Sequence, residues 1–406
     1  MHVSSRVIKN VAVIVTAGFI LSACTSSPSP VLPPVDLPDI KQSLQIDSGW
    51  IQRIGVGASD SYLHLQPAIE GKTGFAVDKN GYLCSFDIVT GKKLWEKQLH
   101  EPLATGPSLQ NGQLYLGTTE GDVLALNPAD GNLIWKVAVS SEVIAAPVGS
   151  RNVVVVRSVD GRLYGLDKRT GRRIWVFERS VPVLTLRGNS QPVIVNEMVI
   201  SGLDNGRLVA LTLAEGNLLW EAIVSVPQGR SEIERLVDID ATPVVQDDVV
   251  YSVTYQGRVA ALRLDSGRIL WSRDISSYSG MQTDAYRIYI SDAAGVIWAL
   301  DRTTGATLWK QDKLLRRSLS RPSLQGRYLV IGDFNGYLHW VNRSDGKLMA
   351  RMRMKRNSFE YKNEKEDDRE FSKTRNILVA PIVRDKHLYA IDRRGVLSSF
   401  QLVSDN

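Results

Sequence analysis

Cysteine and histidine are scarce in this chain. Its 406 residues include two cysteines, Cys24 and Cys84, and five histidines. Two cysteines cannot build the framework of a small disulfide-rich domain. Cys84 lies in a stretch typical of a strand, where we expect a buried small apolar side chain rather than a nucleophile. The histidines are scattered without the spacing of a zinc site, so no metal centre is predicted. They are His2, His64, His100, His339 and His387.

Motifs for catalysis and for nucleic-acid binding are also absent. The sequence contains no GxSxG nucleophile elbow, no phosphate-binding loop and no HExxH zinc motif. Its formal net charge of +6 is a mild excess, and no run of Lys and Arg is interleaved with aromatic residues in a known module. We therefore predict no cofactor and no nucleic-acid partner. Only one long apolar run occurs, at the N-terminus.

That apolar run belongs to a targeting segment. Arg6 and Lys9 form a basic region, the run extends from Val11 to Leu21, and the sequence LSAC ends at Cys24. A run of this length is typical of a signal peptide and is too short to span a bilayer. LSAC resembles the lipobox of bacterial lipoproteins, in which the cysteine becomes the first mature residue and carries the lipid. The alternative is an ordinary signal peptide with a cysteine near its cleavage site.

The lipobox divides the chain into three parts. Residues 1–23 are predicted to be a lipoprotein signal peptide, and residues 24–40 a lipidated cysteine with a flexible, Ser/Pro-rich tether. Thr25 follows the cysteine, and the lipoprotein class then implies the outer membrane, where an Asp would favour the inner one. We expect a lipid-anchored protein at the periplasmic face, with the anchor as its only membrane contact. Residues 41–406 are predicted to form the folded domain.

A sequence repeat dominates the folded domain. Each unit opens on a Gly and has a second Gly ten residues later, and in six units a Trp follows after four more residues. The seventh unit has Ala350 in place of the Trp, and the eighth starts at Gly395 and ends with the chain. Such self-similarity at a period of about 40 residues indicates a repeat architecture. The six units with Trp are 81–95, 121–135, 161–175, 206–220, 257–271 and 295–309.

Each unit predicts four antiparallel strands. The positions two and five residues after the first Gly are apolar in every unit. They lie on opposite faces of a strand, which must be buried on both sides. Both glycines mark hairpin turns, and Asp87, Asp167 and Asp301 recur at a turn position that favours hairpin stabilisation over catalysis. Four strands per repeated unit are typical of a β-propeller.

The predicted fold class is therefore all-β: an eight-bladed β-propeller of four-stranded antiparallel blades. The last unit lacks its fourth strand, and 45-QIDSGWIQRIG-55 resembles that strand, so this N-terminal strand is expected to close the ring and to remove the sheet edges. The propeller itself is expected to be monomeric. The repeated Trp residues belong to different blades, so they should pack between blades rather than around one ligand. Ala350 predicts looser packing at the seventh blade, or another side chain in its place.

Three connections between blades are enlarged. In a four-stranded meander all inter-blade connections open on one face of the ring, and long loops on a rigid scaffold are common binding sites. The enlarged connections are 176–191, which contains VLTLRG, 221–242, which contains VDIDAT, and 355–376, which is highly charged. The charged connection is expected to be solvated and partly mobile.

The first two enlarged connections belong to adjacent blades. Leu184, Leu186 and Arg187 are therefore expected near Asp238 and Asp240. One interpretation is internal: the leucines fold back onto the blades and Arg187 pairs with an Asp. The other is an apolar patch rimmed by charge, which is typical of a protein-binding surface.

The Gly/Trp repeats resemble the quinoprotein-type (PQQ-like) propeller repeat. Together with the lipobox, the eight units and the VLTLRG and VDIDATP segments, essentially the whole chain resembles the propeller lipoproteins of the outer-membrane β-barrel assembly machinery. The resemblance implies a non-enzymatic scaffold that binds the periplasmic POTRA domains of the barrel-forming subunit and aids membrane insertion of outer-membrane proteins. Nascent barrel strands are a second partner class. The residues that match the family's contact surface are Leu184, Leu186, Arg187, Asp238 and Asp240.

Two other functions remain as alternatives. One is a PQQ-dependent periplasmic dehydrogenase with the quinone and a calcium ion on the propeller axis. Many such enzymes carry adjacent cysteines over the cofactor, and this chain has no cysteine pair. The other is a carbohydrate-binding propeller, for which the loops lack an aromatic cluster.

Overall fold

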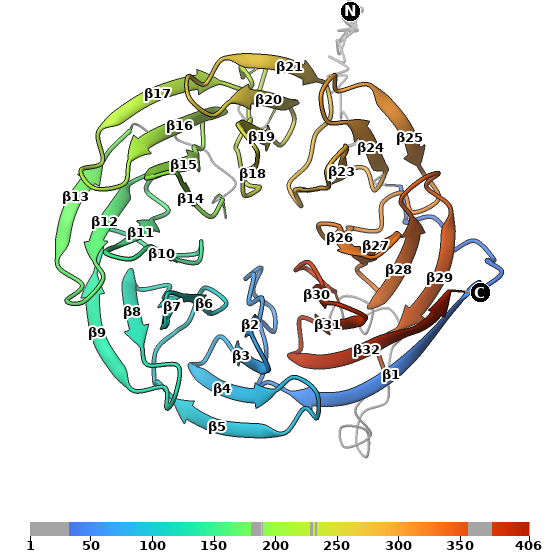
Figure 1. Cartoon of the computed structure of the whole chain (residues 1–406), viewed down its shortest axis with the longest axis horizontal. Helices are drawn as coiled ribbons and strands as arrows, with labels where there is room; N and C mark the ends of the chain where they lie inside the picture. The colour runs from blue at the N-terminus through green and yellow to red at the C-terminus, as the bar shows by residue number, and fades with distance from the viewer. Residues whose placement is uncertain are drawn as a thin grey trace, which may run out of the picture. The chain divides into compact units, whose positions relative to one another are not determined.

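Eight four-stranded antiparallel sheets follow one another around a central axis in residues 34–406 (Figure 1). The protein is represented by a computed structural model that describes residues 32–179, 188, 190–227, 230–231, 234–355 and 376–405. In seven blades the strands pair in chain order, the first near the axis and the fourth at the rim. This arrangement confirms the predicted eight-bladed propeller. Among the described residues, no helix is long and apolar enough to cross a membrane.

The strand boundaries follow the repeat. Blades one to four consist of β2 (Ala68–Glu70), β3 (Thr73–Val77), β4 (Tyr82–Asp87), β5 (Lys93–Gln98); β6 (Ser108–Gln110), β7 (Gln113–Gly117), β8 (Asp122–Leu126), β9 (Leu133–Ala138); β10 (Val148–Gly149), β11 (Val153–Arg157), β12 (Leu163–Asp167), β13 (Arg173–Phe177); and β14 (Val193–Val195), β15 (Met198–Gly202), β16 (Arg207–Thr212), β17 (Leu218–Ile223). Blades five to eight consist of β18 (Val244–Gln246), β19 (Val249–Val253), β20 (Val259–Arg263), β21 (Ile269–Arg273); β22 (Met281–Thr283), β23 (Arg287–Ser291), β24 (Ile297–Asp301), β25 (Thr307–Gln311); β26 (Ser323–Gln325), β27 (Tyr328–Gly332), β28 (Tyr337–Asn342), β29 (Leu348–Arg353); and β30 (Ile382–Arg384), β31 (His387–Ile391), β32 (Val396–Asp405), β1 (Leu44–Arg53).

The N-terminal strand closes the ring, as predicted. β1 pairs antiparallel with β32, from Leu44 opposite Asp405 to Arg53 opposite Val396, with two irregularities in the register. Joining the two ends of the chain in one sheet leaves no propeller blade with a missing strand. Closure of this kind protects the sheet edges that an open array would expose.

A Trp from each of the first six blades caps the next blade. The indole Nε1 of Trp135, for example, donates a hydrogen bond of 2.8 Å to the carbonyl of Lys168. Its ring lies on Gly171, where an added Cβ would approach the ring to 2.7 Å and where φ is +73°. Gly therefore satisfies both the turn and the close contact, and the prediction that these residues pack between blades is confirmed. The equivalent contacts are Trp95 with Gly131, Trp175 with Gly216, Trp220 with Gly267, Trp271 with Gly305, Trp309 with Gly346 and, from β1, Trp50 with Gly91.

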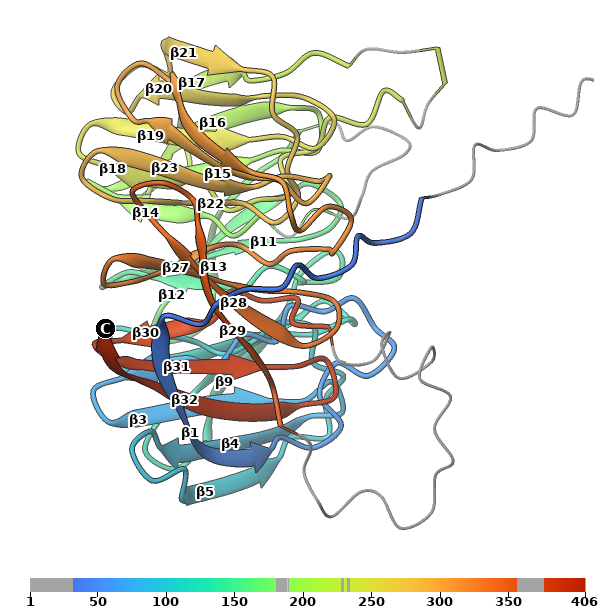
Figure 2. The ribbon, with the colours of Figure 1, turned by 90° about the vertical axis from the view of Figure 1, so that its right-hand side faces the viewer.

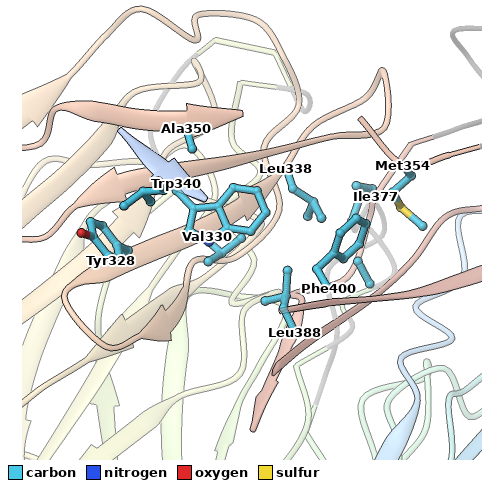
Figure 3. Close-up of a cluster of buried hydrophobic side chains, with 11 residues drawn as sticks. Tyr328, Val330, Leu338, Trp340, Ala350, Met354, Ile377, Leu388 and Phe400 are labelled. Carbon is cyan, nitrogen blue, oxygen red and sulfur yellow. The ribbon is translucent and has the colours of Figure 1, made fainter. Parts of the chain in front are cut away.

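In the seventh blade the large side chain lies on the third strand and the small one on the fourth, the reverse of the other repeats. In the other repeats a small residue on the third strand faces the Trp, as Ala125 faces Trp135. In blade seven Trp340 stands on the third strand and faces Ala350. Trp340 is fully buried, and Figure 3 shows it beside Ala350 in the hydrophobic cluster shared with blade eight. Ala350 predicted either looser packing at the seventh blade or another side chain in place of the Trp. The structure shows the second outcome, because Trp340 fills this space.

The chain before β1 also contacts the propeller. The backbone N–H of Val35 donates to the carbonyl of Leu315 at 3.2 Å, and the Arg317 guanidinium donates to the carbonyl of Val35 at 3.1 Å. Arg351 likewise donates to the carbonyl of Pro38 at 3.2 Å. The predicted tether, residues 24–40, thus has its described C-terminal part against blade seven, and its first residues lie outside the described part of the chain.

Inter-blade connections and the turns between second and third strands meet on one face. The backbone N–H of Leu99, which follows β5, donates to the carbonyl of Gly81, which precedes β4. Leu103 in the same connection donates to the carbonyl of Lys79. The described parts of the connection between β17 and β18 project from this face (Figure 2). The described parts of this enlarged connection therefore lie on the face predicted for it.

Candidate functional site

The structure describes two of the six residues proposed for binding or lipidation. Asp238 and Asp240 lie in the connection between β17 and β18. The other four lie outside the described residues, so their roles stay predictions. They are Cys24, Leu184, Leu186 and Arg187. Most of the charged connection, residues 356–375, also lies outside.

The VDID segment turns into the protein rather than out of it. Val237, Asp238 and Ile239 are 3%, 1% and 0% exposed. The backbone N–H of Ile239 donates to the carbonyl of Leu203 in blade four, and the carbonyl of Asp238 accepts from the N–H of Tyr255 in blade five. This part of the connection is thus tied between two blades. Asp238 is an internal residue, and its neighbour at position 240 is the more accessible one.

The two enlarged connections meet where they return to the axis. The Ser190 hydroxyl donates to the carbonyl of Ala241 at 3.2 Å, and the backbone N–H of Gln191 donates to the Thr242 hydroxyl at 3.3 Å. These bonds hold the end of the first connection against the end of the second. The sequence placed the two connections on adjacent blades, and their described ends are in direct contact.

Asp240 stands in an unfavourable electrostatic environment. Burial, and after it the charge of Asp238, raises its pKa to about 7; Asp204 acts in the same direction and the positive charge of Arg157 in the opposite one. Its Oδ1 is buried and has no hydrogen-bond partner in the described part of the protein. The backbone of Gly188 passes so close that an added Cβ would lie 3.0 Å from this oxygen. The ionised form of this carboxyl is therefore disfavoured, and groups with strongly shifted pKa values are found preferentially at functional sites.

Asp240 also lines a cavity of about 390 Å³ at the axis, whose lining residues come from the first strands of the blades or from the connections that lead into them. The lining is polar and of mixed charge, with Arg321, Arg384 and His64 facing the same space. His64 is solvent-accessible, but the many groups around it in the opening partly desolvate the imidazole and lower its pKa, and the positive charge of Arg321 acts in the same direction. The inter-blade connections thus surround an axial opening in which Asp240 is the acidic group.

Elsewhere in the described residues, one group of three acidic side chains is close enough to suggest a cation site. These are Glu101, Glu120 and Asp122. The Lys136 ammonium lies 2.7 Å from a carboxylate oxygen of Glu101 and 3.0 Å from one of Asp122. Lysine thus supplies the positive charge here, and the group is an ion-pair cluster. Cys84 is fully buried inside β4, as predicted for an apolar role.

Comparison with known proteins identifies the family. The family described as outer membrane protein assembly factor BamB matches residues 79–311. The chain is 36% identical to the outer membrane protein assembly factor BamB of Yersinia pestis over 94% of this chain and 96% of that protein. The chain belongs to the BamB family. The assembly-factor function that the sequence resemblance implied is thereby supported over a quinone-dependent dehydrogenase.

Solved structures agree with this assignment. The crystal structure of BamB from Moraxella catarrhalis superposes with a TM-score of 0.77 at 25% identity, covering 88% of this chain and all of that one. A quinohemoprotein alcohol dehydrogenase from Comamonas testosteroni superposes with a TM-score of 0.68 at 11% identity, covering 88% of this chain and 76% of that one. The second likeness concerns the propeller fold alone. The propeller architecture of this chain thus also occurs in an enzyme with which it shares 11% of its aligned residues.

Two residues of the site were missed by sequence reasoning. Arg157, the last residue of β11, forms a buried ion pair with Asp204, which follows β15 in the next blade. Both side chains are at most 2% exposed, and both charges act on Asp240. The available signal was a local departure from the repeat, which becomes visible only when the residues before each opening Gly are aligned as well.

Proposed function

We propose that this protein is a non-catalytic scaffold of the outer-membrane β-barrel assembly machinery. It is anchored at the periplasmic face by a lipid on Cys24 and binds POTRA domains of the barrel-forming subunit (BamA). Nascent outer-membrane proteins are a second partner class. The observation that carries the proposal is the direct contact between the two enlarged connections around Asp240 in a chain of the BamB family.

The binding residues divide into two roles. Asp240 reaches the axial opening, and one of its carboxylate oxygens has no hydrogen-bond partner among the described residues, so we propose that it receives a basic or hydrogen-bonding group of a partner. Asp238 is 1% exposed and supports the segment from inside. We retain Leu184, Leu186 and Arg187 as contact residues, with the leucines as apolar anchors and Arg187 as a charged one.

A binding titration tests this division. Purified POTRA domains are titrated onto the soluble propeller, and a Leu184→Ala/Arg187→Ala double variant is compared with wild type. Loss of an apolar anchor and a charge at an interface should weaken binding at least about tenfold. A Leu308→Ala/Lys310→Ala double variant on β25 is the matched control, because it removes the same residue classes from a distant strand. Wild-type affinity of the first variant would exclude this surface.

Absence of catalysis is a separate part of the proposal. The protein should show no visible-absorbance change on mixing with PQQ and calcium, and no dye-linked alcohol oxidation afterwards. A positive result in both assays would favour the dehydrogenase alternative, independently of any result on POTRA binding.

A further inference from the structure

Two adjacent repeats depart from the common pattern just before their opening glycines. Three residues before that Gly, seven units carry an Asp, Ser or Thr, and the fourth unit carries Leu203. Four residues before it, the third unit carries Arg157, and no other unit has a charged residue there. The residues at the first position are Asp78, Thr118, Ser158, Leu203, Thr254, Asp292, Asp333 and Asp392; those at the second are Val77, Gly117, Arg157, Gly202, Val253, Ser291, Gly332 and Ile391.

The polar residue at the first position normally stabilises its own turn. Asp292, for example, accepts hydrogen bonds from the backbone N–H groups of Ala294 at 2.9 Å and Val296 at 2.7 Å. Leu203 cannot accept such bonds. The fourth unit has its acidic residue one position later, at Asp204, and that carboxylate pairs with Arg157 of the neighbouring blade instead. The local turn has lost a stabilising side chain, and an inter-blade ion pair has been formed.

The same ion pair holds the end of the first enlarged connection. Arg157 Nη1 donates a hydrogen bond of 3.0 Å to the carbonyl of Gly188. The space around Gly188 is closed: an added Cβ would lie 2.7 Å from Asp204 Oδ1, 3.0 Å from Arg157 Nη1 and 3.0 Å from Asp240 Oδ1. Only a residue without a side chain lets the backbone lie between the ion pair and the Asp240 carboxylate.

We propose that Arg157 and Asp204 are positioning residues for the partner-binding surface, and that they hold the chain at Gly188 against Asp240. The inference rests on the proposed function, because it assigns the pair to the surface formed by the two enlarged connections. The buried Arg157 guanidinium is held in place by the Asp204 carboxylate and the Gly188 carbonyl. If its geometry is lost, both of these acceptors are left without a hydrogen-bond donor. The pair therefore determines where the first connection ends.

Blade seven supplies a matched control. The Arg317 guanidinium pairs with Asp333 at 2.8 Å, donates to the carbonyl of Val35, and is 4% exposed. It thus has the same chemistry, burial and contact with a connecting segment. Arg317 lies in the connection between β25 and β26, which is neither of the two enlarged connections at the proposed surface.

The test compares Arg157→Lys, Gly188→Ala and Arg317→Lys in the full mature chain. Lysine keeps the charge but cannot donate to two partners in the fork geometry of arginine. Alanine at position 188 keeps the ion pair but forces the backbone away from it. Three quantities are measured: amide hydrogen exchange in peptides that cover residues 188–191 and 236–242, the Kd for POTRA domains, and Tm.

Arg157→Lys and Gly188→Ala should each speed exchange in these peptides by at least about tenfold and raise Kd by about tenfold. Arg317→Lys should lower Tm by about as much as Arg157→Lys does. It should leave both Kd and the exchange of these peptides unchanged. Unchanged exchange in the first two variants overturns the inference, and so does an equal rise of Kd in the Arg317 variant. If Arg157→Lys and Gly188→Ala speed exchange but leave Kd unchanged, the positioning role is upheld and the proposed binding surface is contradicted. Failure of the positioning role and failure of the binding surface are therefore distinguishable.

Discussion

At the scale of single residues, Asp240 combines partial burial, two neighbouring carboxylates and one neighbouring guanidinium. Its pKa is raised from 3.8 to about 7, first by burial and then by Asp238. The folded state therefore binds a proton more tightly than the unfolded state. The stability contributed by this protonation is fully present below about pH 4, and it is lost as the pH rises through 7.

Asp240→Asn should flatten this pH dependence. The amide cannot ionise, so the variant avoids the cost of a buried charge. Between pH 5 and pH 8 the wild type should lose about 2–3 kcal/mol of unfolding free energy relative to the variant. Urea unfolding at the two pH values measures the difference.

Asp301→Asn is the control for that measurement. Hydrogen bonds from the Thr304 side chain and backbone lower the pKa of this exposed turn carboxyl. Its substitution should therefore bring no gain in stability at pH 8. Parallel pH profiles for wild type and Asp240→Asn would contradict the assignment of a raised pKa to Asp240.

Sequence reasoning at the residue scale had a clear limit. It placed Asp238 and Asp240 together, two residues apart in an extended segment, and could not say which one faces inward. The answer depends on backbone hydrogen bonds to Leu203 and Tyr255, which belong to two different blades. Turn residues were predictable because their interactions are local: Asp87 accepts from the N–H of Val89 and Thr90, as its recurrence indicated.

At the scale of elements, the contact between one blade's Trp and the next blade's hairpin Gly explains why the repeat contains both. It also explains Ala350. Blade eight receives its fourth strand from the N-terminus, so no hairpin joins β32 to β1, and a Trp at position 350 would have no hairpin Gly to cover. Trp340 fills the interior from the adjacent strand instead, with its Nε1 bonded to Gln325 at 2.8 Å.

Trp340→Ala should therefore be strongly destabilising, by about 3–5 kcal/mol, because it leaves a cavity in a closed interface. Restoring the common pattern with Trp340→Ala/Ala350→Trp should recover little of that loss, since the hairpin that receives the ring is missing. Chemical denaturation of both variants measures this. Recovery of wild-type stability in the double variant would show that the pattern does not depend on the hairpin.

The repeat predicted that some side chain could replace the seventh Trp, but it did not identify Trp340. Position 340 is small in the other repeats, and a Trp there reads from the sequence as an exception rather than as a compensation. Only the pairing of Trp340 with Ala350 shows that the two exceptions are one change.

At the scale of the whole molecule, the ring is closed by one strand from the N-terminal end of the chain. β1 is paired along β32, and Trp50 covers Gly91 of blade one and donates to the carbonyl of Ile88 at 2.9 Å. The same strand therefore completes blade eight and joins it to blade one. Sequence reasoning found this closure because 45–55 matches the one strand that the last unit lacks.

Deletion of residues 44–53 should open the ring. The edge of β32 and the surface under Trp50 become exposed, which favours association between chains. We expect a lower Tm for the deletion variant, and oligomers in size-exclusion chromatography with light scattering. Trp50→Ala should be less damaging and should lower the free energy of unfolding by about 3–5 kcal/mol. A deletion variant that stays monomeric with unchanged Tm would disprove closure by β1.

Site-specific photo-crosslinking in cells tests the central claim most directly, namely that the enlarged connections near Asp240 form the surface for the barrel-forming subunit. A photoreactive residue at Val226, which is 58% exposed beside β17, reports on this surface, and one at Leu133, which is 55% exposed on β9, reports on a distant rim. We expect a crosslink to POTRA domains from position 226 and none from position 133. A crosslink from position 133 alone would contradict it.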